Sequence, residues 1–446
     1  MHIKSNEQVR SSKEYVLKDP LTFKIKLLQW AQQFEEVIWL DSNNYKQQYS
    51  SYDAVLAVDA FTAIKTDYYH GFDTLKEYQE QTRDWIFGYL SYDLKNDVEH
   101  LVSKNQDDLG FPDLYFFQPK KLFLLKGNII EIQYVRMVED EIKEDFESIT
   151  AISVETIVFD KDIEEPCEKI KISLRITKDV YKEKVNQMLA HIHRGDIYEA
   201  NFCQEFYAKN SCIQPLPTYY HLNAISKPPF ATFFKINNCY LLSASPERYL
   251  RKQGNKIISQ PIKGTAKRSL DSEEDKKMMS DLEKDPKERS ENVMIVDLVR
   301  NDLSRTATKG SVKVEELCKV YSFDQVHQMI STVVSEIDDK TSPVDVIKTT
   351  FPMGSMTGAP KISAMKIIEN LEESKRGVYS GAVGYFSPEG DFDFNVVIRS
   401  ILYNEEKQYV SYTVGGAITA KSDPDKEYEE CLLKAKAMRE ALEGVL

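Results

Sequence analysis

The chain has 446 residues, of which 42% are hydrophobic and 29% are charged. These proportions are typical of a folded globular protein and exclude a mostly disordered chain. The formal net charge of −13 disfavours a protein that follows the phosphates of a nucleic acid. No apolar stretch approaches the ~20 residues of a membrane span, and the N-terminus has no apolar signal core. We therefore expect a cytoplasmic protein whose partners include neither nucleic acid nor membrane.

Residues 1–138 are predicted to be rich in β-strands. Short apolar runs alternate there with turn residues, for example in 54–58 and 85–90. The pair Gly127-Asn128 precedes another apolar run and is typical of a hairpin turn.

Residues 139–170 are predicted to form an acidic linker, because acidic residues become frequent and apolar residues rare there. Residues 171–446 then mix helices and strands. The first helix is expected to begin behind Thr177, a favourable N-cap, and to end at Gly195.

Three further helices are expected in the second half of the chain. One tract runs from Ser272 towards Ser304, and Pro286 should split or kink it. Another helix should start at Pro360, and the last one near Pro424. The apolar residues of the last helix, which should point mostly inward, are Leu432, Leu433, Ala435 and Met438.

Several common catalytic motifs are missing from the sequence. There is no G-x-x-x-x-G-K-[ST] phosphate loop, no G-x-G-x-x-G dinucleotide fingerprint and no G-x-S-x-G nucleophile elbow. His191 and His193 lie two apart on a predicted helix, so they point to different faces and do not suggest a metal site. The six cysteines show no C-x-x-C spacing and are best explained as reduced thiols.

Three polar, turn-rich segments could carry chemistry. Residues 243–248 place the carboxylate of Glu247 at a turn, and residues 261–265 place Lys263 before a Gly-Thr pair. Residues 351–361 form a loop that leads into a helix N-terminus, which favours a carboxylate or phosphate group. Taken singly, each segment is more often a plain turn than a site.

Two pairs of glutamates are more suggestive. Glu288 and Glu291 lie three residues apart in one helical tract, and Glu427 and Glu430 do so in the last helix. Residues at this spacing share a helix face. If the two helices met, four carboxylates would form an oxygen-rich site suited to Mg²⁺. By spacing alone, two solvated helix faces remain the more common explanation.

In this order, these segments resemble the chorismate-utilising enzymes. That family includes component I of aminodeoxychorismate synthase and of anthranilate synthase, and the isochorismate and salicylate synthases. The resemblance extends from about Arg194 to Met438. The matching segments are 195–202, 245–248, 261–265, 291–302, 310–312, 354–361, 398–399 and 415–418.

The resemblance implies an α+β fold with two large antiparallel β-sheets in a sandwich, helices outside and the site between the sheets. Residues 1–138 would be the N-terminal sheet-rich region, and residues 171–446 the chorismate-binding catalytic region. The segment 139–170 would then join parts of one intertwined unit.

Two positions indicate which member the chain resembles. Lys263 stands in P-I-K-G-T, the form found in aminodeoxychorismate synthases, whereas anthranilate synthases usually carry Ala at that position. Glu199 stands where isochorismate and salicylate synthases carry a water-activating lysine. The ammonia-using members usually have Gln there, so Glu199 is a departure from the family pattern.

The resemblance also implies the roles of the site residues. Lys263 would add covalently to the substrate ring, which requires a lowered pKa, while Glu247 would be the general acid and base. His327 would lie near the reacting ring, and Glu199 would complete the catalytic group. Substrate contacts would come from Gly264, Thr265, Ser355, Thr357, Gly358, Tyr385, Arg399, Gly415 and Gly416. Mg²⁺ would be held by Glu291 and Glu430, with Glu288 and Glu427 holding its waters.

The implied reaction converts chorismate and ammonia to 4-amino-4-deoxychorismate, on the route to para-aminobenzoate and folate. The ammonia would come from glutamine through a separate glutamine amidotransferase subunit, because no cysteine here stands in a G-x-C-x-G turn. Two alternatives are anthranilate synthase component I and a non-catalytic subunit of the same fold that only binds its ligand. The intact Lys263, Glu247, Glu291 and Glu430 speak against the second.

Overall fold

The computed structural model describes residues 9–45, 48–153, 170–324 and 326–444. Its strands are β1 (Arg10–Val16), β2 (Glu36–Asp41), β3 (Ala54–Thr66), β4 (Ile86–Leu90), β5 (Leu114–Lys126), β6 (Ile129–Val135), β7 (Ser173–Leu174), β8 (Glu199–Ala208), β9 (Phe230–Ile236), β10 (Cys239–Ser245), β11 (Arg248–Gln253), β12 (Lys256–Gln260), β13 (Ile262–Lys267), β14 (Lys313–Ser322), β15 (Val326–Glu336), β16 (Gly358–Ala359), β17 (Ala382–Phe386), β18 (Phe392–Val396), β19 (Ser400–Asn404) and β20 (Tyr409–Thr419).

The helices of the described residues are α1 (Pro20–Trp30), α2 (Gly71–Thr82), α3 (Lys95–Glu99), α4 (Ile142–Ala151), α5 (Lys178–Arg194), α6 (Pro215–Ser226), α7 (Ser272–Lys284), α8 (Pro286–Ser304), α9 (Pro343–Thr350), α10 (Lys361–Leu371) and α11 (Pro424–Glu443). Short 3₁₀ turns are η1 (Ala31–Gln33), η2 (Tyr92–Leu94), η3 (Arg136–Glu141) and η5 (Gly354–Met356). None of these helices combines the length and the apolar character that a membrane crossing requires.

Two antiparallel sheets meet at the long strand β5. One edge of β5 pairs with β3, whereas the other edge pairs first with β4 and then with β6. The first sheet has the order β1-β6-β5-β3-β2-β9-β10-β19-β20-β8, and the second continues from β5 through β4-β17-β18-β11-β12-β15. Strands β13 and β14 both pair with β15. The α+β fold with two antiparallel sheets is thereby confirmed.

The N-terminal and C-terminal regions are interleaved within both sheets. Strand β2 pairs with β9, and β4 pairs with β17. Within residues 139–170, Ile142–Ala151 form helix α4, which packs on α1 with Ile142 and Ile149 fully buried. The first part of the predicted linker is therefore structured, because these two isoleucines supply a helical apolar face. Residues 154–169 lie outside the described part of the chain.

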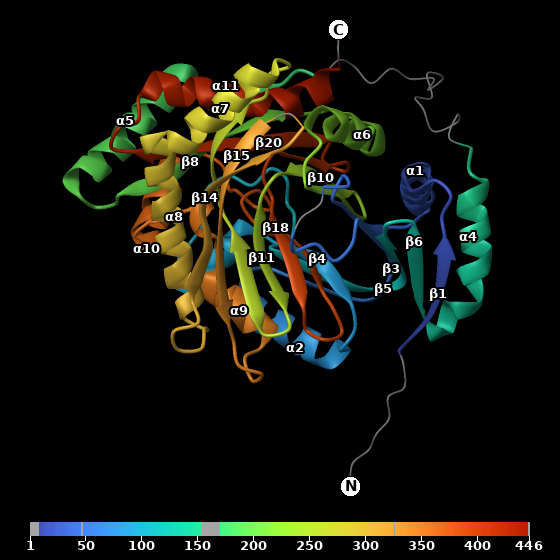
Figure 1. Ribbon diagram of the computed structural model, residues 1–446. Coiled ribbons are helices and arrows are strands. Elements are labelled where there is room, and N and C mark those ends of the chain that lie inside the picture. Colours follow the sequence, from blue (N-terminus) through green and yellow to red (C-terminus); the bar gives the residue numbers. More distant parts are fainter. Residues whose placement is uncertain (1–8, 46–47, 154–169, 325, 445–446) are drawn as a thin grey trace.

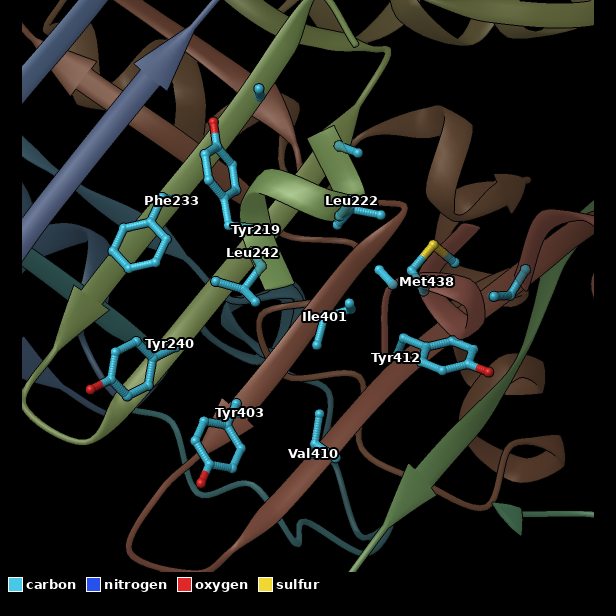
Figure 2. Close-up of a cluster of buried hydrophobic side chains, with 14 of the residues drawn as sticks. Tyr219, Leu222, Phe233, Tyr240, Leu242, Ile401, Tyr403, Val410, Tyr412 and Met438 are labelled. Atoms are coloured by element: carbon cyan, nitrogen blue, oxygen red, sulfur yellow. The ribbon is translucent and has the colours of Figure 1, made fainter. Parts of the chain in front are cut away.

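Helices cover the sheets on several sides (Figure 1). Helices α5, α7 and α11 gather at one end of the molecule, α8 runs alongside β14 and β15, and α1 and α4 lie beside β1 and β6. One core cluster fills the space between the first sheet and α5, α6, α10 and α11. Figure 2 shows part of it, in which Tyr219 and Leu222 of α6 and Met438 of α11 face aromatic and aliphatic residues of β9, β10, β19 and β20. A second core cluster joins both sheets with α2, α8 and α9.

The predicted helix ends agree with the structure where a capping residue marks them. Thr177 accepts a hydrogen bond from the Val180 amide at the start of α5, and Gly195 ends this helix with a φ of 88°. The tract around Pro286 is split into α7 and α8, and Asp285 caps the second helix. On α11, Leu432 and Leu433 are exposed, contrary to prediction. The buried stripe follows Cys431, Ala435 and Met438 instead.

Candidate active site

The side chain of Lys263 forms an ion pair with Glu199. Lys263 lies on β13 and Glu199 begins β8, and the distance from Nζ to the carboxylate Oε1 is 3.3 Å. Only 14% of the lysine side chain and 3% of the glutamate side chain are exposed. Burial disfavours the charged lysine, but the carboxylates of Glu199, Glu291 and Glu247 outweigh it and raise the pKa of Lys263. The expected lowering of this pKa is therefore not found in the free protein.

Glu247 lies between β10 and β11 and is 6% exposed. Burial raises the pKa of Glu247 to about 7. The hydrogen bond from Ser355 and the positive charges of Lys263 and Arg399 act in the opposite direction but do not cancel this rise. The Ser355 hydroxyl donates to its Oε1 at 2.7 Å. A carboxyl group with a pKa near neutrality can both donate and accept a proton during a reaction.

The loop 351–360 is fastened against β8. The Asn201 amide side chain donates to the Ser355 carbonyl oxygen at 3.2 Å, and the Asn201 backbone N–H donates to the Thr357 carbonyl at 2.8 Å. Gly358 pairs with Ala200, where an added Cβ would lie 2.2 Å from the Glu199 carbonyl oxygen. This close approach requires glycine.

The side chains of this loop point in different directions. The buried Thr357 hydroxyl donates to the carbonyl oxygens of Met353 and Gly354 in the same loop. In the free protein it is therefore engaged with the loop and not free for the predicted substrate contact. Ser355, by contrast, reaches Glu247. A small cavity of about 20 Å³ lies against these two residues and is also lined by Asp302 and Thr350.

Arg399 is held in an unusual backbone conformation between β18 and β19. Its φ of 51° lies in the left-handed region, which costs energy for a residue other than glycine. Burial lowers the pKa of Arg399, and Glu247 opposes this effect. Among the described residues, none accepts a hydrogen bond from its guanidinium group within bonding distance. The N–H groups of its guanidinium are thus available to bind a carboxylate through two parallel hydrogen bonds.

Gly415 and Gly416 lie on β20 opposite the start of β8. An added Cβ at Gly415 would lie 2.3 Å from the Cys203 sulfur and 2.6 Å from the Asn201 amide oxygen. An added Cβ at Gly416 would point towards the carboxylates of Glu427 and Glu430, at 3.4 and 3.9 Å. The two glycines therefore bring backbone close to the last helix without side chains in between.

The four predicted metal-binding glutamates lie on α8 and α11. Burial raises the pKa of Glu291 to about 7, and burial also raises the pKa of Glu288 and of Glu427. The charge of Glu430 on α11 adds to the rise at Glu288 on α8, so these two carboxylates influence each other across the two helices.

Two lysines balance part of this negative charge. Lys434 lies 2.7 Å from Glu430, and Lys287 lies 3.8 Å from Glu291. Within the described residues, no three His, Cys, Asp or Glu side chains converge at metal-binding distance. The donor set nevertheless fits a hard divalent cation in kind, because it consists only of carboxylate oxygens, which magnesium prefers.

Among the described residues, His327 forms no hydrogen bond with Lys263. Its ring nitrogens contact Asp275 of α7 at 3.0 Å and the Ser322 hydroxyl at 2.8 Å. On β13, the residue opposite His327 is Ala266. Ala266 packs against a small buried cluster that consists of Leu282, Cys318, Val320 and Met329. The neighbour Gln328 pairs with Thr265, and the register between β13 and β15 shifts between Ile262 and Thr265.

Tyr385 lines a cavity of about 70 Å³ together with Leu40, Asp41 and Phe230. Tyr379, six residues earlier, has its hydroxyl 3.6 Å from the Cys203 sulfur, which packs against Gly415. Of the two tyrosines, Tyr379 therefore lies beside the predicted substrate-binding glycines, and only the fold distinguishes them.

Comparisons with known proteins agree with this arrangement. Residues 35–440 match the family described as chorismate binding enzyme. The chain is 33% identical over 362 residues to an anthranilate synthase component I-like protein of Synechocystis sp., covering 81% of this chain and 73% of that protein. It is 38% identical over 268 residues to aminodeoxychorismate synthase component 1 of Escherichia coli, covering 60% of this chain and 58% of that protein.

A solved structure shows the same fold. It is the anthranilate synthase component I of Streptococcus pneumoniae, with a TM-score of 0.73 and 25% sequence identity. The superposition covers 89% of this chain and 95% of that chain.

Proposed function

Because the chain belongs to the family of chorismate binding enzymes, we propose that it is component I of an aminodeoxychorismate synthase. Relatives with two different activities are similar to it, so the choice between them rests on one observation. A lysine, Lys263, reaches into the site from β13 and pairs with Glu199. An alanine in its place could not form a bond to the substrate.

In the proposed reaction, the neutral amine of Lys263 adds to C2 of chorismate. The ring double bonds shift and the C4–O bond breaks, while Glu247 gives its proton to the departing hydroxyl, which leaves as water. Ammonia then forms a bond to C4 as the bond from C2 to the lysine nitrogen breaks. The product is 4-amino-4-deoxychorismate, and the lysine amine is regenerated.

The side-chain carboxylate of chorismate is proposed to bind Arg399 and the backbone near Gly415 and Gly416. Arg399 has unused donors, and a bidentate contact would orient the ring against Lys263. Because Lys263 is paired with Glu199 and protonated in the free protein, it must lose a proton to solvent before it attacks, since only the neutral amine is a nucleophile.

Magnesium is proposed as the cofactor. Glu291 and Glu430 would bind it, with Glu288 and Glu427 holding its waters, once Lys287 and Lys434 release their partners. When bound, the ion would neutralise the ring carboxylate of the substrate and weaken the negative charge that keeps Lys263 protonated.

The test is a product assay with chorismate, magnesium and an ammonium salt. We expect aminodeoxychorismate, identified by mass spectrometry or by conversion to para-aminobenzoate with a lyase. Direct appearance of fluorescent anthranilate would favour the alternative activity instead. Complete inactivity with excess ammonium would favour a subunit that only binds its ligand.

The isolated chain is also predicted not to use glutamine. A glutaminase of the usual partner type needs a cysteine in a G-x-C-x-G turn, and none of the six cysteines has glycines at those positions. Adding a separate glutaminase subunit to the same assay should restore glutamine use. Glutamine-dependent product from the pure chain, free of contaminating glutaminase, would contradict this prediction.

A further prediction concerns the hydrogen bond from Ser355 to Glu247. Because this bond favours the charged carboxylate, Ser355→Ala should raise the pKa of Glu247 further above 7, by roughly one unit. When the pKa of a carboxyl group is higher in the folded state than in the unfolded state, the folded protein becomes less stable as pH rises, because the unfolded state releases the proton at a lower pH. The stability difference between S355A and wild type should therefore grow by about 1 kcal/mol between pH 5 and pH 8.

Urea unfolding at a series of pH values measures this difference. Ser400→Ala is the matched control, because Ser400 is also buried but donates to the neutral Ser243 hydroxyl at 2.8 Å. Its stability loss should not change with pH. A loss in S355A that is also constant with pH would show that the bond does not control Glu247.

A further inference from the structure

Glu199 has one carboxylate oxygen that lacks a partner. Its Oε1 accepts the contact from Lys263 at 3.3 Å, whereas its Oε2 is buried and has no hydrogen-bond partner among the described residues. The residue as a whole is 3% exposed. A buried, unpaired carboxylate oxygen is costly, so this position favours a small group that can donate hydrogen bonds and carries positive charge.

The charge around Glu199 points to a cation. Lys263 reaches only Oε1 of Glu199, at 3.3 Å, and its charge is shared with Glu291 and Glu247. The Oε2 atom of Glu199 therefore keeps its full capacity to accept hydrogen bonds from a cation. A divalent metal is a poor fit to a single free oxygen because it requires about six oxygen ligands. A small monovalent donor such as ammonium requires only hydrogen-bond acceptors.

We propose that the free oxygen of Glu199 binds the ammonium ion and takes the proton that converts it into ammonia beside Lys263. This inference rests on the proposed function, since it names the group that supplies the nitrogen. It also gives a reason for glutamate at this position. The neutral glutamine of the resembling enzymes could accept a hydrogen bond but could not take a proton.

The step balances in atoms and charge. Ammonium gives one proton to the Glu199 carboxylate, which becomes a neutral acid, and leaves ammonia. The lone pair of ammonia forms the bond to C4, and the bond from C2 to Lys263 breaks with its electrons returning to the lysine nitrogen. The product nitrogen keeps three hydrogens and the positive charge. Glu199 returns its proton to solvent, and Glu247 regains from solvent the proton that left with water.

The variant Glu199→Gln tests the proposal. It keeps the shape of the side chain and carries the residue that the resembling enzymes usually have, so it should fold. With ammonium chloride as the nitrogen source near neutral pH, the KM for ammonium should rise by about 10-fold or more, as expected for loss of a hydrogen bond to a charged group. With hydroxylamine, which is uncharged at neutral pH, the variant and the wild type should differ by less than about 2-fold.

A second measurement applies whether or not hydroxylamine is accepted. As pH rises towards the pKa of ammonium, free ammonia replaces the ion, so the defect of E199Q with ammonium should shrink. An equal loss with both nucleophiles that does not change with pH would overturn the proposal, because it would show that Glu199 acts only by holding Lys263. An unchanged KM for ammonium would overturn it as well.

These outcomes are separate from the test of the proposed function. If the wild-type product were anthranilate, the proposed activity would be wrong, but the nitrogen would still come from ammonia and E199Q would still test Glu199. If the product contained no nitrogen, both would fail, and the product assay would show this before any variant is made.

Discussion

Replacing Lys263 with alanine should abolish formation of aminodeoxychorismate with ammonium as the nitrogen source. We expect a loss of about 10³-fold or more in kcat, because removing a covalent nucleophile removes the step itself. The change also leaves Glu199 buried without its cation, which lowers stability. The double variant K263A/E199Q removes the buried charge of Glu199 together with its partner, so it should recover part of the lost unfolding midpoint but not the activity.

Lys267→Ala is the matched control for this experiment. Lys267 lies on the same strand, four residues along, and is exposed. Its removal should leave kcat and the unfolding midpoint unchanged. Mass spectrometry of a stalled wild-type reaction should also show added mass on the peptide that contains Lys263. Full activity of the K263A variant would refute a required covalent step.

Replacing either Glu291 or Glu430 with glutamine should remove the dependence of the rate on magnesium. Each change removes a charged oxygen, which a hard cation needs. Turnover should fall by roughly 10²-fold or more, the upper range seen when groups supporting a metal site are lost. Magnesium should also raise the unfolding temperature of the wild type, and this shift should largely disappear in both variants.

The metal-free variants give a second, independent readout. Burial, with the charges of Glu288 and Glu199, raises the pKa of Glu291 to about 7 against the attraction of Lys263 and Lys287. Because the charged form of Glu291 is thus disfavoured without a cation, E291Q should be at least as stable as the metal-free wild type. Glu429→Gln is the control, because Glu429 neighbours Glu430 on α11 but is 74% exposed. A wild-type response to magnesium in E291Q or E430Q would show that the altered residue is not a ligand.

Helix ends and the family resemblance could be predicted from the sequence. Thr177, Gly195 and Asp285 act on backbone groups within a few residues of themselves, so the chain order already contains the relevant contacts. The ordered segments around Glu247 and Lys263 likewise identify the family, because their residue types and order are written in the chain.

The sequence alone could not show which of two similar nearby residues lies in the candidate site. His327 and Gln328 are adjacent on β15, and which of them faces Lys263 depends on its pairing with β13, where the register shifts. Tyr379 and Tyr385 are both buried, and only the position of Cys203 on β8 shows which one lies beside Gly415. These outcomes depend on pairings between strands that are distant in sequence.

The sequence by itself determined the α+β class, the capped helices and the set of polar segments proposed to form the site. Only the tertiary structure decided that the N-terminal strands belong to both sheets, and that Lys263 is charged in the free protein. The lysine is paired with Glu199, 64 residues away in the chain, and its pKa is raised by carboxylates from three separate segments. Local signals fix local structure, whereas the charge state of a buried group depends on every charge that the fold brings near it.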